Sequence, residues 1–580
     1  MNNKGVAIRY GDVAPEAKEN FVPTASESKF DTLAQLQQYN LDFPNYANPC
    51  ELYQTVLDGT ATAFPSVPEQ ANLGLWSNQL SNDDGTFTNP IVLELQSVGQ
   101  YSSQGLTLTF DTYNGIFATR LSIKWLRITG GAIETLAEQE FTPDNAFYFC
   151  RNQVENYNKV VITFYSLNMP KNRLKLRVID YGYGTFFYGD ELRGVKLIQE
   201  IDPISTQISI NTADFTLDSK SDMEYSFQAK QPLSVYFNGE LKATAFVKKS
   251  TRKAKRLWNI QSEDYIGLMD SIPYYGGIYT NKNAVELLTD IFTVAKVPYS
   301  IGDVFAGETV TGYIPYTTCR DALMQVAFAI QAVVDTSNSE VVKVFALEGD
   351  IKQTIPLNRI MQGQNFADEE TVTGVEVAVH SYKPITETAD VYEATESGTG
   401  QNIFVKFSEP LHDLSITNGE IISSGTNYAI INANANCVLT GQKYEHTTQT
   451  RRQNNPVVLA SEIEKIVAIE SATLVSQYNI DNVIEKCYNW LIKTNTTNLK
   501  IVEGKHIQYG EPYKYGTGLK YGTGLKYGGK HPNIITYDGK VNVGENIKAE
   551  TEYLGVVSGR LIKQSFNLNG NIIVKEAVLK

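Results

Sequence analysis

The fold class of the chain is decided by residues 310–347, which read VTGYIPYTTCRDALMQVAFAIQAVVDTSNSEVVKVFAL. Thr318 stands three residues before Asp321 in a capping-box-like start, which predicts a helix followed by two short apolar strands. Upstream, residues 283–298 read NAVELLTDIFTVAKVP, in which an apolar stripe at helical spacing ends at a proline. The order strand, helix, strand, helix, hairpin predicts an α+β domain.

The chain upstream of this domain is expected to form β-structure. Residues 204–218 (ISTQISINTADFTLD) change the phase of their alternation, so a β-bulge near Asn211 and Thr212 is expected to restore one buried face. Residues 232–247 predict a hairpin with Asn-Gly at its turn. From about residue 31 to 195, short alternating segments separated by turn clusters predict a β-sandwich or jelly roll.

The chain downstream of the α+β domain predicts strands around one more helix. Residues 370–460 return to β-structure with long polar turns, and residues 483–493 (VIEKCYNWLIK) predict a helix. The last residues predict a hairpin with Asn-Gly at its turn. The whole chain is therefore expected to be a multidomain, β-rich α+β protein.

Residues 514–530 read KYGTGLKYGTGLKYGGK and repeat a six-residue unit. Six is an even number, so an extended chain would point every tyrosine to the same side. One interpretation is a flexible linker that arose by duplication. The other is an ordered arm with Tyr515, Tyr521 and Tyr527 pinned against the same or a neighbouring subunit, because tyrosine buries a large ring with few rotatable bonds.

The charge and cysteine content argue against several classes of protein. Asp and Glu number 64 against 50 Lys and Arg, and the net charge of −14 disfavours a general nucleic-acid binder. Five cysteines stand far apart without a CxxC motif, so we expect free thiols in a reducing cytoplasm rather than disulfides or a zinc site. We expect neither a secretory signal nor membrane insertion, because no sufficiently long apolar stretch occurs.

No motif indicates a catalytic or cofactor site. HExxH, GxSxG, GxxxxGKS/T and GxGxxG are absent, and the five histidines keep no metal-ligand spacing, so no enzyme activity, metal or cofactor is expected. A Cys–His pair assembled in space stays an open alternative. Asp83 and Asp84 could form a calcium loop or a glycosidase carboxylate pair, but a turn rich in Asn, Asp and Gly explains them more simply.

The basic run KKSTRKAKR, residues 248–256, has three interpretations. It could be an exposed strand edge or hairpin, a surface that docks onto an acidic neighbouring subunit, or a nucleic-acid contact. Lys253, Lys255 and Arg256 are the candidates for subunit docking.

Aromatic residues of the first domain are candidates for carbohydrate contact, because sugar sites often use exposed aromatic faces. Most aromatic residues of a sandwich nevertheless lie in its core. The candidates are Trp76, Tyr101 and Tyr113.

Residues 263–279 (EDYIGLMDSIPYYGGIY), 208–219 and 310–347, together with the 232–247 hairpin, resemble the baseplate-hub and tail-tip proteins of bacteriophages and phage-like particles of Gram-positive bacteria. The resemblance covers about residues 200–350, and PYTTCRDALMQVAFAIQAVVDT is its most specific piece. It implies tail-tube-like β-barrel hub domains with two helices, arranged in a ring. Residues 57–87 and 101–115 look like a discoidin-type or carbohydrate-binding jelly roll.

The resemblance implies a structural, non-enzymatic role in the virion tail. We expect a ring of three or six copies that docks other tail or baseplate proteins, made in the bacterial cytoplasm, with no cofactor and possible contact to host cell-wall glycan. The alternatives are a free carbohydrate-binding adhesin and a tail-associated peptidoglycan hydrolase. The expected domains are an arm (1–30), a β-sandwich (31–198), a hub-type α+β domain (199–350), a second β-rich hub domain (351–480) and a C-terminal helix, repeat arm and hairpin (481–580).

Overall fold

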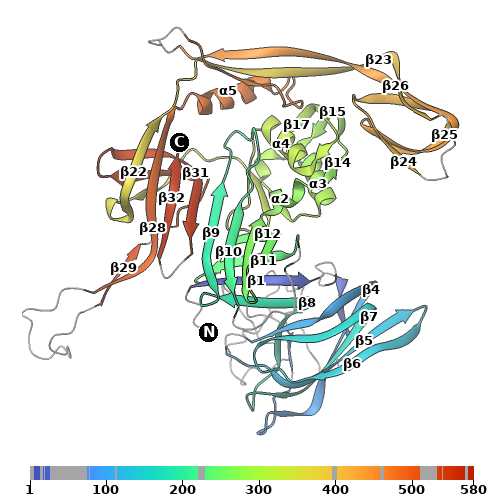
Figure 1. Ribbon diagram of the computed structural model, residues 1–580, viewed down its shortest axis with the longest axis vertical. Helices are drawn as coiled ribbons and strands as arrows, with labels where there is room; N and C mark the ends of the chain where they lie inside the picture. Colours follow the sequence, from blue (N-terminus) through green and yellow to red (C-terminus); the bar gives the residue numbers. More distant parts are fainter. Residues whose placement is uncertain are drawn as a thin grey trace, which may run out of the picture. The chain divides into compact units, whose positions relative to one another are not determined.

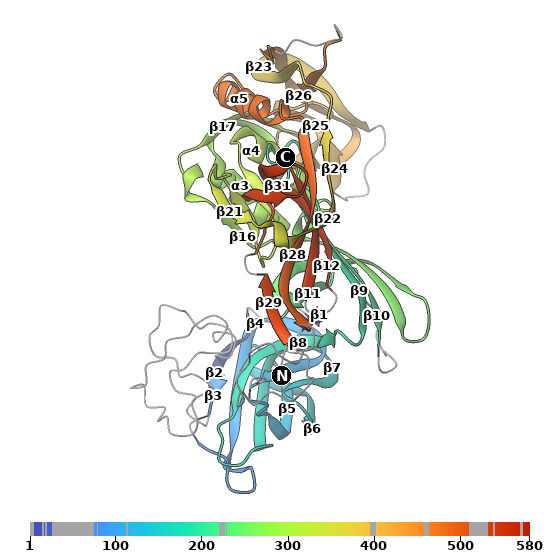
Figure 2. The same cartoon turned by 90° about the vertical axis from the view of Figure 1, so that its left-hand side faces the viewer.

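The computed structural model describes residues 5–13, 17, 20–25, 75–77, 79–111, 114–219, 227, 229–394, 402–456, 463–509, 532–537, 540–568 and 572–580. These residues belong to two compact units, drawn in Figures 1 and 2. The N-terminal unit is essentially Ile8–Phe187 and the C-terminal unit is essentially Tyr188–Lys580. The finer division into five domains stays a prediction. None of the helices in the described ranges is long and apolar enough to cross a membrane.

The N-terminal unit is built from antiparallel strands that pair in the order β6–β5–β7–β4–β8–β3, with β2 also paired to β4. The alternating segments recognised in the sequence lie in β4, β5, β7 and β8, because alternate residues of a strand face the same side. The strands are β2 (Val22–Ala25), β3 (Leu75–Trp76), β4 (Thr86–Phe110), β5 (Ala118–Thr129), β6 (Ala132–Phe141), β7 (Phe147–Leu167) and β8 (Lys175–Tyr188).

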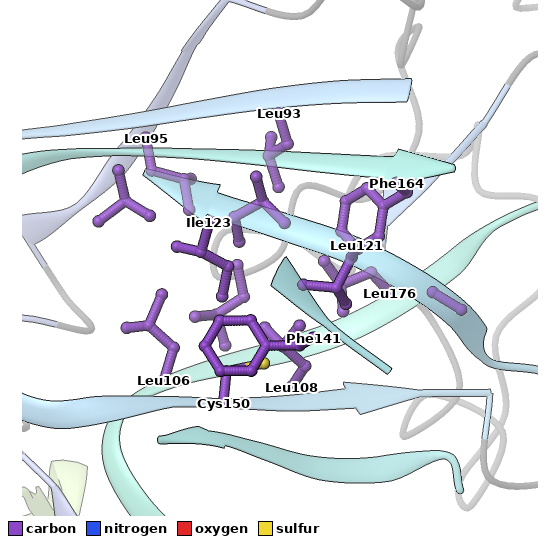
Figure 3. Packing of buried hydrophobic residues seen from close by; sticks show 14 of the residues in the cluster. Leu93, Leu95, Leu106, Leu108, Leu121, Ile123, Phe141, Cys150, Phe164 and Leu176 are labelled. Atoms are coloured by element: carbon purple, nitrogen blue, oxygen red, sulfur yellow. The ribbon is translucent and has the colours of Figure 1, made fainter. Parts of the chain in front are cut away.

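The pairing of β4 with β7 shifts register between Gln96 and Gly105. Gly105 has φ +143°, and a Cβ there would lie 2.2 Å from the Cys150 carbonyl oxygen, so glycine alone fits. Apolar side chains on either side of these shifts pack into one core (Figure 3), which agrees with a β-sandwich, while its jelly-roll character stays a prediction. The residues labelled there are Leu93, Leu95, Leu106, Leu108, Leu121, Ile123, Phe141, Cys150, Phe164 and Leu176.

The largest sheet of the C-terminal unit pairs antiparallel in the order β12–β13–β10–β9–β31–β32–β28–β22. Its members are β9 (Leu192–Glu200), β10 (Thr212–Asp218), β12 (Glu240–Arg252), β13 (Leu257–Glu263), β22 (Ile360–Asp368), β28 (Asn495–Tyr509), β31 (Gly555–Asn567) and β32 (Ile572–Leu579). β30 (Asn546–Thr551) pairs with β31, β21 (Ile351–Ile355) with β30, and β29 (Pro532–Tyr537) with β28.

Two expectations for this sheet are wrong. In the described residues the pairing path stays open from β12 to β22, so a single chain does not form the closed tail-tube-like barrel. The expected β-bulge at Asn211–Thr212 is also absent, because the strand begins only at Thr212 and the preceding residues are irregular. The phase change therefore marks the start of a strand, and the buried Ile204 and Ile208 pack from outside it. The 232–247 hairpin is confirmed as β11 (Pro232–Phe237) and β12.

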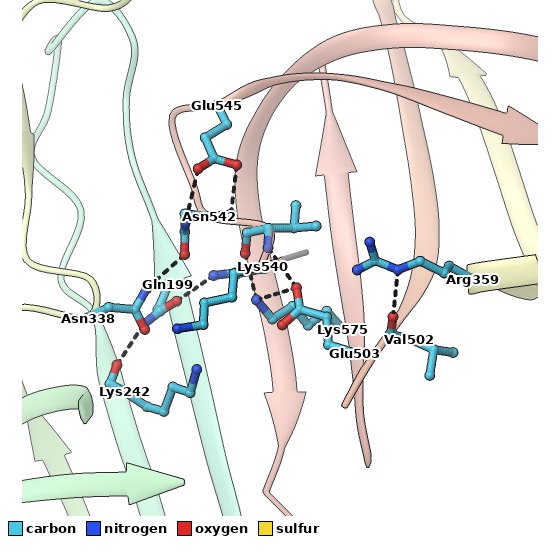
Figure 4. Close-up of polar contacts among 12 residues, drawn as sticks. Gln199, Lys242, Asn338, Arg359, Val502, Glu503, Lys540, Asn542, Glu545 and Lys575 are labelled. Atoms are coloured by element: carbon cyan, nitrogen blue, oxygen red, sulfur yellow. Dashed lines mark hydrogen bonds and ion pairs between the residues drawn. The ribbon is translucent and has the colours of Figure 1, made fainter. Parts of the chain in front are cut away.

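Charged side chains lie buried within this part of the C-terminal unit (Figure 4). Lys575 and Glu503 form an ion pair of 2.9 Å, and Lys575 Nζ also donates to the Val541 carbonyl oxygen at 2.6 Å. The Val541 N–H donates back to Glu503 Oε1 at 2.8 Å. Burial lowers the pKa of Lys575, while the charge of Glu503 acts in the opposite direction. The pair therefore ties β28 and β32 to the segment before β30, because each buried charge needs its partner.

The expected α+β domain and its helix boundaries are confirmed. Asn283 Oδ1 accepts from the Val285 and Glu286 N–H groups at the start of α3, and Thr318 Oγ1 accepts from the Asp321 N–H at 3.1 Å at the start of α4. The elements are α2 (Tyr265–Met269), β14 (Pro273–Tyr274), β15 (Gly277–Asn283), α3 (Ala284–Ala295), β16 (Tyr299–Ile301), β17 (Thr309–Ile314), β18 (Thr317–Thr318), α4 (Cys319–Ala329), β19 (Val333–Asp335) and β20 (Val342–Phe345).

A long two-stranded ribbon follows (Figure 1), in which β23 and β26 pair along most of their length. β24 and β25 pair with β26 at one end and enclose a small apolar cluster that includes Val405, Ile431 and Leu439. β27 and α5 lie at the other end, which we call the ribbon base. The bounds are β23 (Gly374–Ala394), β24 (Ile403–Lys406), β25 (Leu411–Ser424), β26 (Tyr428–Asn454), β27 (Ile466–Ile469) and α5 (Ile480–Leu491).

Candidate assembly surfaces

Lys253, Lys255 and Arg256 lie in the turn that joins β12 to β13, and all three are exposed. We call residues 253–256 the basic turn. Its backbone is held by the Lys253 N–H, which donates to the Leu257 carbonyl oxygen at 2.8 Å. Arg252 donates from Nη2 to the Lys255 carbonyl oxygen at 2.6 Å. The hairpin position agrees with the first interpretation of the basic run, and docking through the basic turn stays a prediction.

The three candidate carbohydrate contacts are only partly visible in the structure. Trp76 belongs to β3, although its side chain is outside the described residues, as is the whole of Tyr113. Tyr101 is half-buried: its hydroxyl accepts from Asn20 Nδ2 at 2.7 Å, and its ring centroid lies 5.7 Å from that of Phe21. This residue therefore packs against an N-terminal segment, and sugar contact stays a prediction.

The repeat tyrosines Tyr515, Tyr521 and Tyr527 are outside the described residues. The described strands on either side of the repeat pair with each other as far as Tyr509 and Pro532, the last residue of β28 and the first of β29. The repeat therefore connects the two strands of a hairpin, and its role as an ordered arm stays a prediction.

Other sequence expectations can be checked directly. Asp83 and Asp84 lie in a turn, where Asp84 Oδ1 accepts from the N–H and hydroxyl of Thr86 at 2.9 and 2.6 Å. The four described cysteines are free and buried, as expected: Cys150, Cys319, Cys437 and Cys487. Burial raises the pKa of the Cys487 thiol to about 12. The described residues contain no group of three or more His, Cys, Asp or Glu side chains that could hold a metal ion.

Asn427 joins the far end of the ribbon to the α+β domain, and nothing in the sequence singled it out. Its buried amide donates from Nδ2 to the carbonyl oxygens of Tyr275 and Ile314 at 2.7 and 2.9 Å. Its Oδ1 accepts from the Tyr313 hydroxyl at 2.8 Å. The amide is therefore fully used, which fixes the end of the ribbon on the domain.

Aromatic rings surround this contact. Tyr275 stacks on Tyr428 with ring centroids 4.3 Å apart, and Phe404 lies 5.7 Å from Tyr428. Tyr316 lies 5.9 Å from Phe404, and the ammonium of Lys406 lies 4.5 Å from the centre of the Tyr316 ring. Tyr275 and Phe404 are both partly exposed, so the cluster is also a surface that a partner could contact.

Two histidines meet on the ribbon, although 66 positions separate them in the chain. His380 Nδ1 and His446 Nε2 are 2.9 Å apart, and the His446 ring stacks on Tyr382 with centroids 4.5 Å apart. His380 Nε2 lies 3.2 Å from the Glu470 carbonyl oxygen. Burial, followed by the charge of His446, lowers the pKa of His380.

No protein-family model and no curated protein sequence matches the chain. Solved structures do match. A tail protein from Neisseria meningitidis MC58 is 9% identical, with 67% of this chain and 91% of that chain covered at a TM-score of 0.37. The 43 kDa tail protein of prophage MuSo2 from Shewanella oneidensis is 9% identical, with 68% and 94% covered and a TM-score of 0.37. Prophage tail protein gp18 from Listeria monocytogenes EGD-e is 10% identical, with 68% and 91% covered and a TM-score of 0.33.

Proposed function

We propose that this chain is a structural, non-enzymatic protein of the tail tip or baseplate of a phage or phage-like particle of Gram-positive bacteria. In that particle it forms a closed ring of three or six copies and docks neighbouring tail proteins. The motifs of residues 263–279 and 310–347 support the class, because they resemble hub and tail-tip proteins.

The observation that carries the proposal is the open end of the large sheet at β22. None of the nine residues of β22 is buried, and Met361 and Phe366 are 46% and 43% exposed. The strand pairs in register with β28. An exposed strand edge with apolar side chains is a template for pairing with another chain. β22 is therefore the surface on which we place the next copy.

Head-to-tail contacts between identical copies close into a ring when the rotation between them allows it. In this arrangement the β22 edge of each copy packs on a different surface of its neighbour. The barrel wall that one chain leaves open is then completed by several chains together.

The test reverses the apolar character of the edge. In the variant Met361→Lys with Phe366→Lys, we expect the number of copies per particle to fall at least tenfold. The melting temperature should stay within a few degrees of wild type, because exposed substitutions change stability by about 0.5 kcal/mol or less. The matched control is Val304→Lys, an equally exposed apolar residue of the α+β domain. Normal incorporation of the double variant, or a wild-type particle with one copy or none, would refute the proposal.

A contact between the N-terminal unit and host cell-wall glycan is a finer part of the proposal. The measurement is binding of the assembled particle and of the purified chain to a glycan array. Loss of binding in Trp76→Ala with Tyr101→Ala would support it. Glycan binding by a chain that never joins a particle would favour the free adhesin, and a clear zone in a peptidoglycan zymogram would favour the hydrolase.

A further inference from the structure

The turn between β30 and β31 presents apolar side chains to solvent. Tyr553 is 78% exposed and Val556 is 64% exposed, and Leu554 between them is also exposed. The turn is held from within: the Thr551 hydroxyl donates to the Gly555 carbonyl oxygen at 2.8 Å and accepts from the Leu554 N–H at 3.0 Å. A preorganised turn with an exposed apolar tip is the form that a contact site takes.

An acidic side chain stands at the start of this tip. Glu552 is exposed, and in the described part of the chain its carboxylate makes no ion pair. Glu550, in contrast, accepts from the Leu357 N–H at 3.3 Å. We call Glu552–Val556 the knob: it combines one negative charge with an aromatic and two aliphatic side chains.

A cleft of about 470 Å³ lies elsewhere in the C-terminal unit, along one side of α5. Asn482, Lys486, Asn489 and Lys493 line it, and their spacing of three or four residues places them on one face of the helix. Trp490 lines the same cleft. The volume suits a few side chains of a peptide rather than a folded domain.

Positive charge gathers around this cleft. The Lys486 ammonium donates to the Gln331 carbonyl oxygen, and Arg560 donates to the carbonyl oxygens of Gly544 and Glu348 at 2.6 and 2.8 Å. The ammonium of Lys493 lies 5.3 Å from the centre of the Trp490 ring. In the described residues these cations therefore meet carbonyl groups and a ring, and Glu485 is the one carboxylate that lines the cleft.

The cations also act on one another. Burial lowers the pKa of Lys486 to about 8, and the charge of Arg560 lowers it further. Burial, followed by the charges of Arg560 and Lys580, lowers the pKa of Lys493. Like charges held together in a partly buried cleft are relieved when an anion enters it, because the anion favours the charged form of each.

We propose that this cleft receives the knob of a second copy of the chain, with the Glu552 carboxylate among Lys486, Lys493 and Arg560 and the Tyr553 ring against Trp490. The inference rests on the proposed ring and names a contact within it. Charge complementarity selects a second copy: the chain as a whole carries a net charge of −14, and the knob pairs its acid with the apolar surface that Trp490 needs.

The knob of a chain cannot fill the cleft of the same chain. Arg560 belongs to the same strand as the knob, five residues after Gly555, and an extended strand separates them by about 16 Å. Knob and cleft are thus two different surfaces at a fixed separation. A contact between them joins copies head to tail, which is the contact that builds a ring.

The test is a charge swap. Glu552→Lys and Lys493→Glu are each expected to lower incorporation into particles about tenfold, because each places like charges together. The double variant, Glu552→Lys with Lys493→Glu, is expected to restore incorporation to within threefold of wild type. Glu420→Lys, an exposed charge reversal on β25, is the matched control and should incorporate normally.

A cross-link tests the contact independently. With Glu552→Cys and Asn489→Cys in one chain, oxidation of the particle should give a ladder of linked chains, whereas either cysteine alone should not. The described native cysteines are buried, so they do not compete. A double charge variant no better than the single ones, or the absence of a ladder, overturns the inference. Rings that form normally in every variant overturn it while leaving the proposed function standing; a wild-type chain that forms no ring overturns the proposed function.

Discussion

Lys575→Met should strip the buried Glu503 carboxylate of its cation. The two groups are 2.9 Å apart, and their side chains are only 5% and 8% exposed. Removing one partner of a buried pair costs about 3–5 kcal/mol. Glu503 keeps the N–H of Val541 as a donor, which places the expected loss at about 3 kcal/mol. The Val541 carbonyl oxygen loses its own donor, which adds about 1 kcal/mol.

Native-state hydrogen exchange of the backbone amides in β28, β31 and β32 measures this loss where it occurs, without unfolding the other parts of the chain. A loss of about 3–4 kcal/mol corresponds to exchange that is roughly 10²–10³ times faster, since 1.4 kcal/mol is tenfold. Amides of the N-terminal unit serve as an internal control and should not change.

Replacing both charges separates the cost of an orphaned carboxylate from the worth of the pair. Lys575→Met with Glu503→Leu puts apolar groups of similar size in both places, and such exchanges are often neutral or stabilising. We expect most of the lost protection to return. The reasoning fails if Lys575→Met speeds exchange less than tenfold, or if the double variant exchanges as fast as the single one.

Three further outcomes are expected. Because the pKa of His380 is lowered in the folded chain, its stabilising effect is complete above its unfolded pKa of about 6.5 and is lost as pH falls towards its folded pKa; hydrogen exchange at the ribbon base should show this loss, and His380→Gln should abolish it. Reversing all three charges of the basic turn to Glu should weaken incorporation into particles while the melting temperature stays within a few degrees, and a large fall in that temperature would instead assign the turn a structural role. Changing the three repeat tyrosines to Ser should loosen particle assembly and leave the rest of the chain folded; if deleting one six-residue unit changes nothing, the repeat is a linker.

Features that depend on neighbouring residues could be predicted from the sequence. The start of α4 follows from Thr318 and Asp321, three positions apart, and the β11–β12 hairpin from the Asn-Gly pair at its turn. Both Asn238 and Gly239 have positive φ, the geometry that this pair favours. Local chemistry fixes such elements whatever the rest of the chain does.

Features that depend on distant residues could not be predicted. His380 meets His446 because two strands pair in one register, and no spacing in the sequence encodes that register. Asn427 is one of many asparagines until Tyr275 and Ile314 bring it two carbonyl oxygens. The candidate cleft likewise needs α5 to lie beside Arg560, which comes much later in the chain.

The pairing of β9 with β31 also has a consequence for synthesis of the chain. Glu200 lies opposite Lys563, so one side of β9 has no partner until the last part of the chain has been made. At about 5–20 residues per second, translation from one to the other takes roughly 20–70 s. Throughout that time the nascent chain carries an unpaired strand on the ribosome, and it is then that we expect chaperones to be needed. A ribosome that stalls before residue 563 leaves a fragment whose β9 can pair with another nascent chain, so the order of translation itself guards against premature self-association.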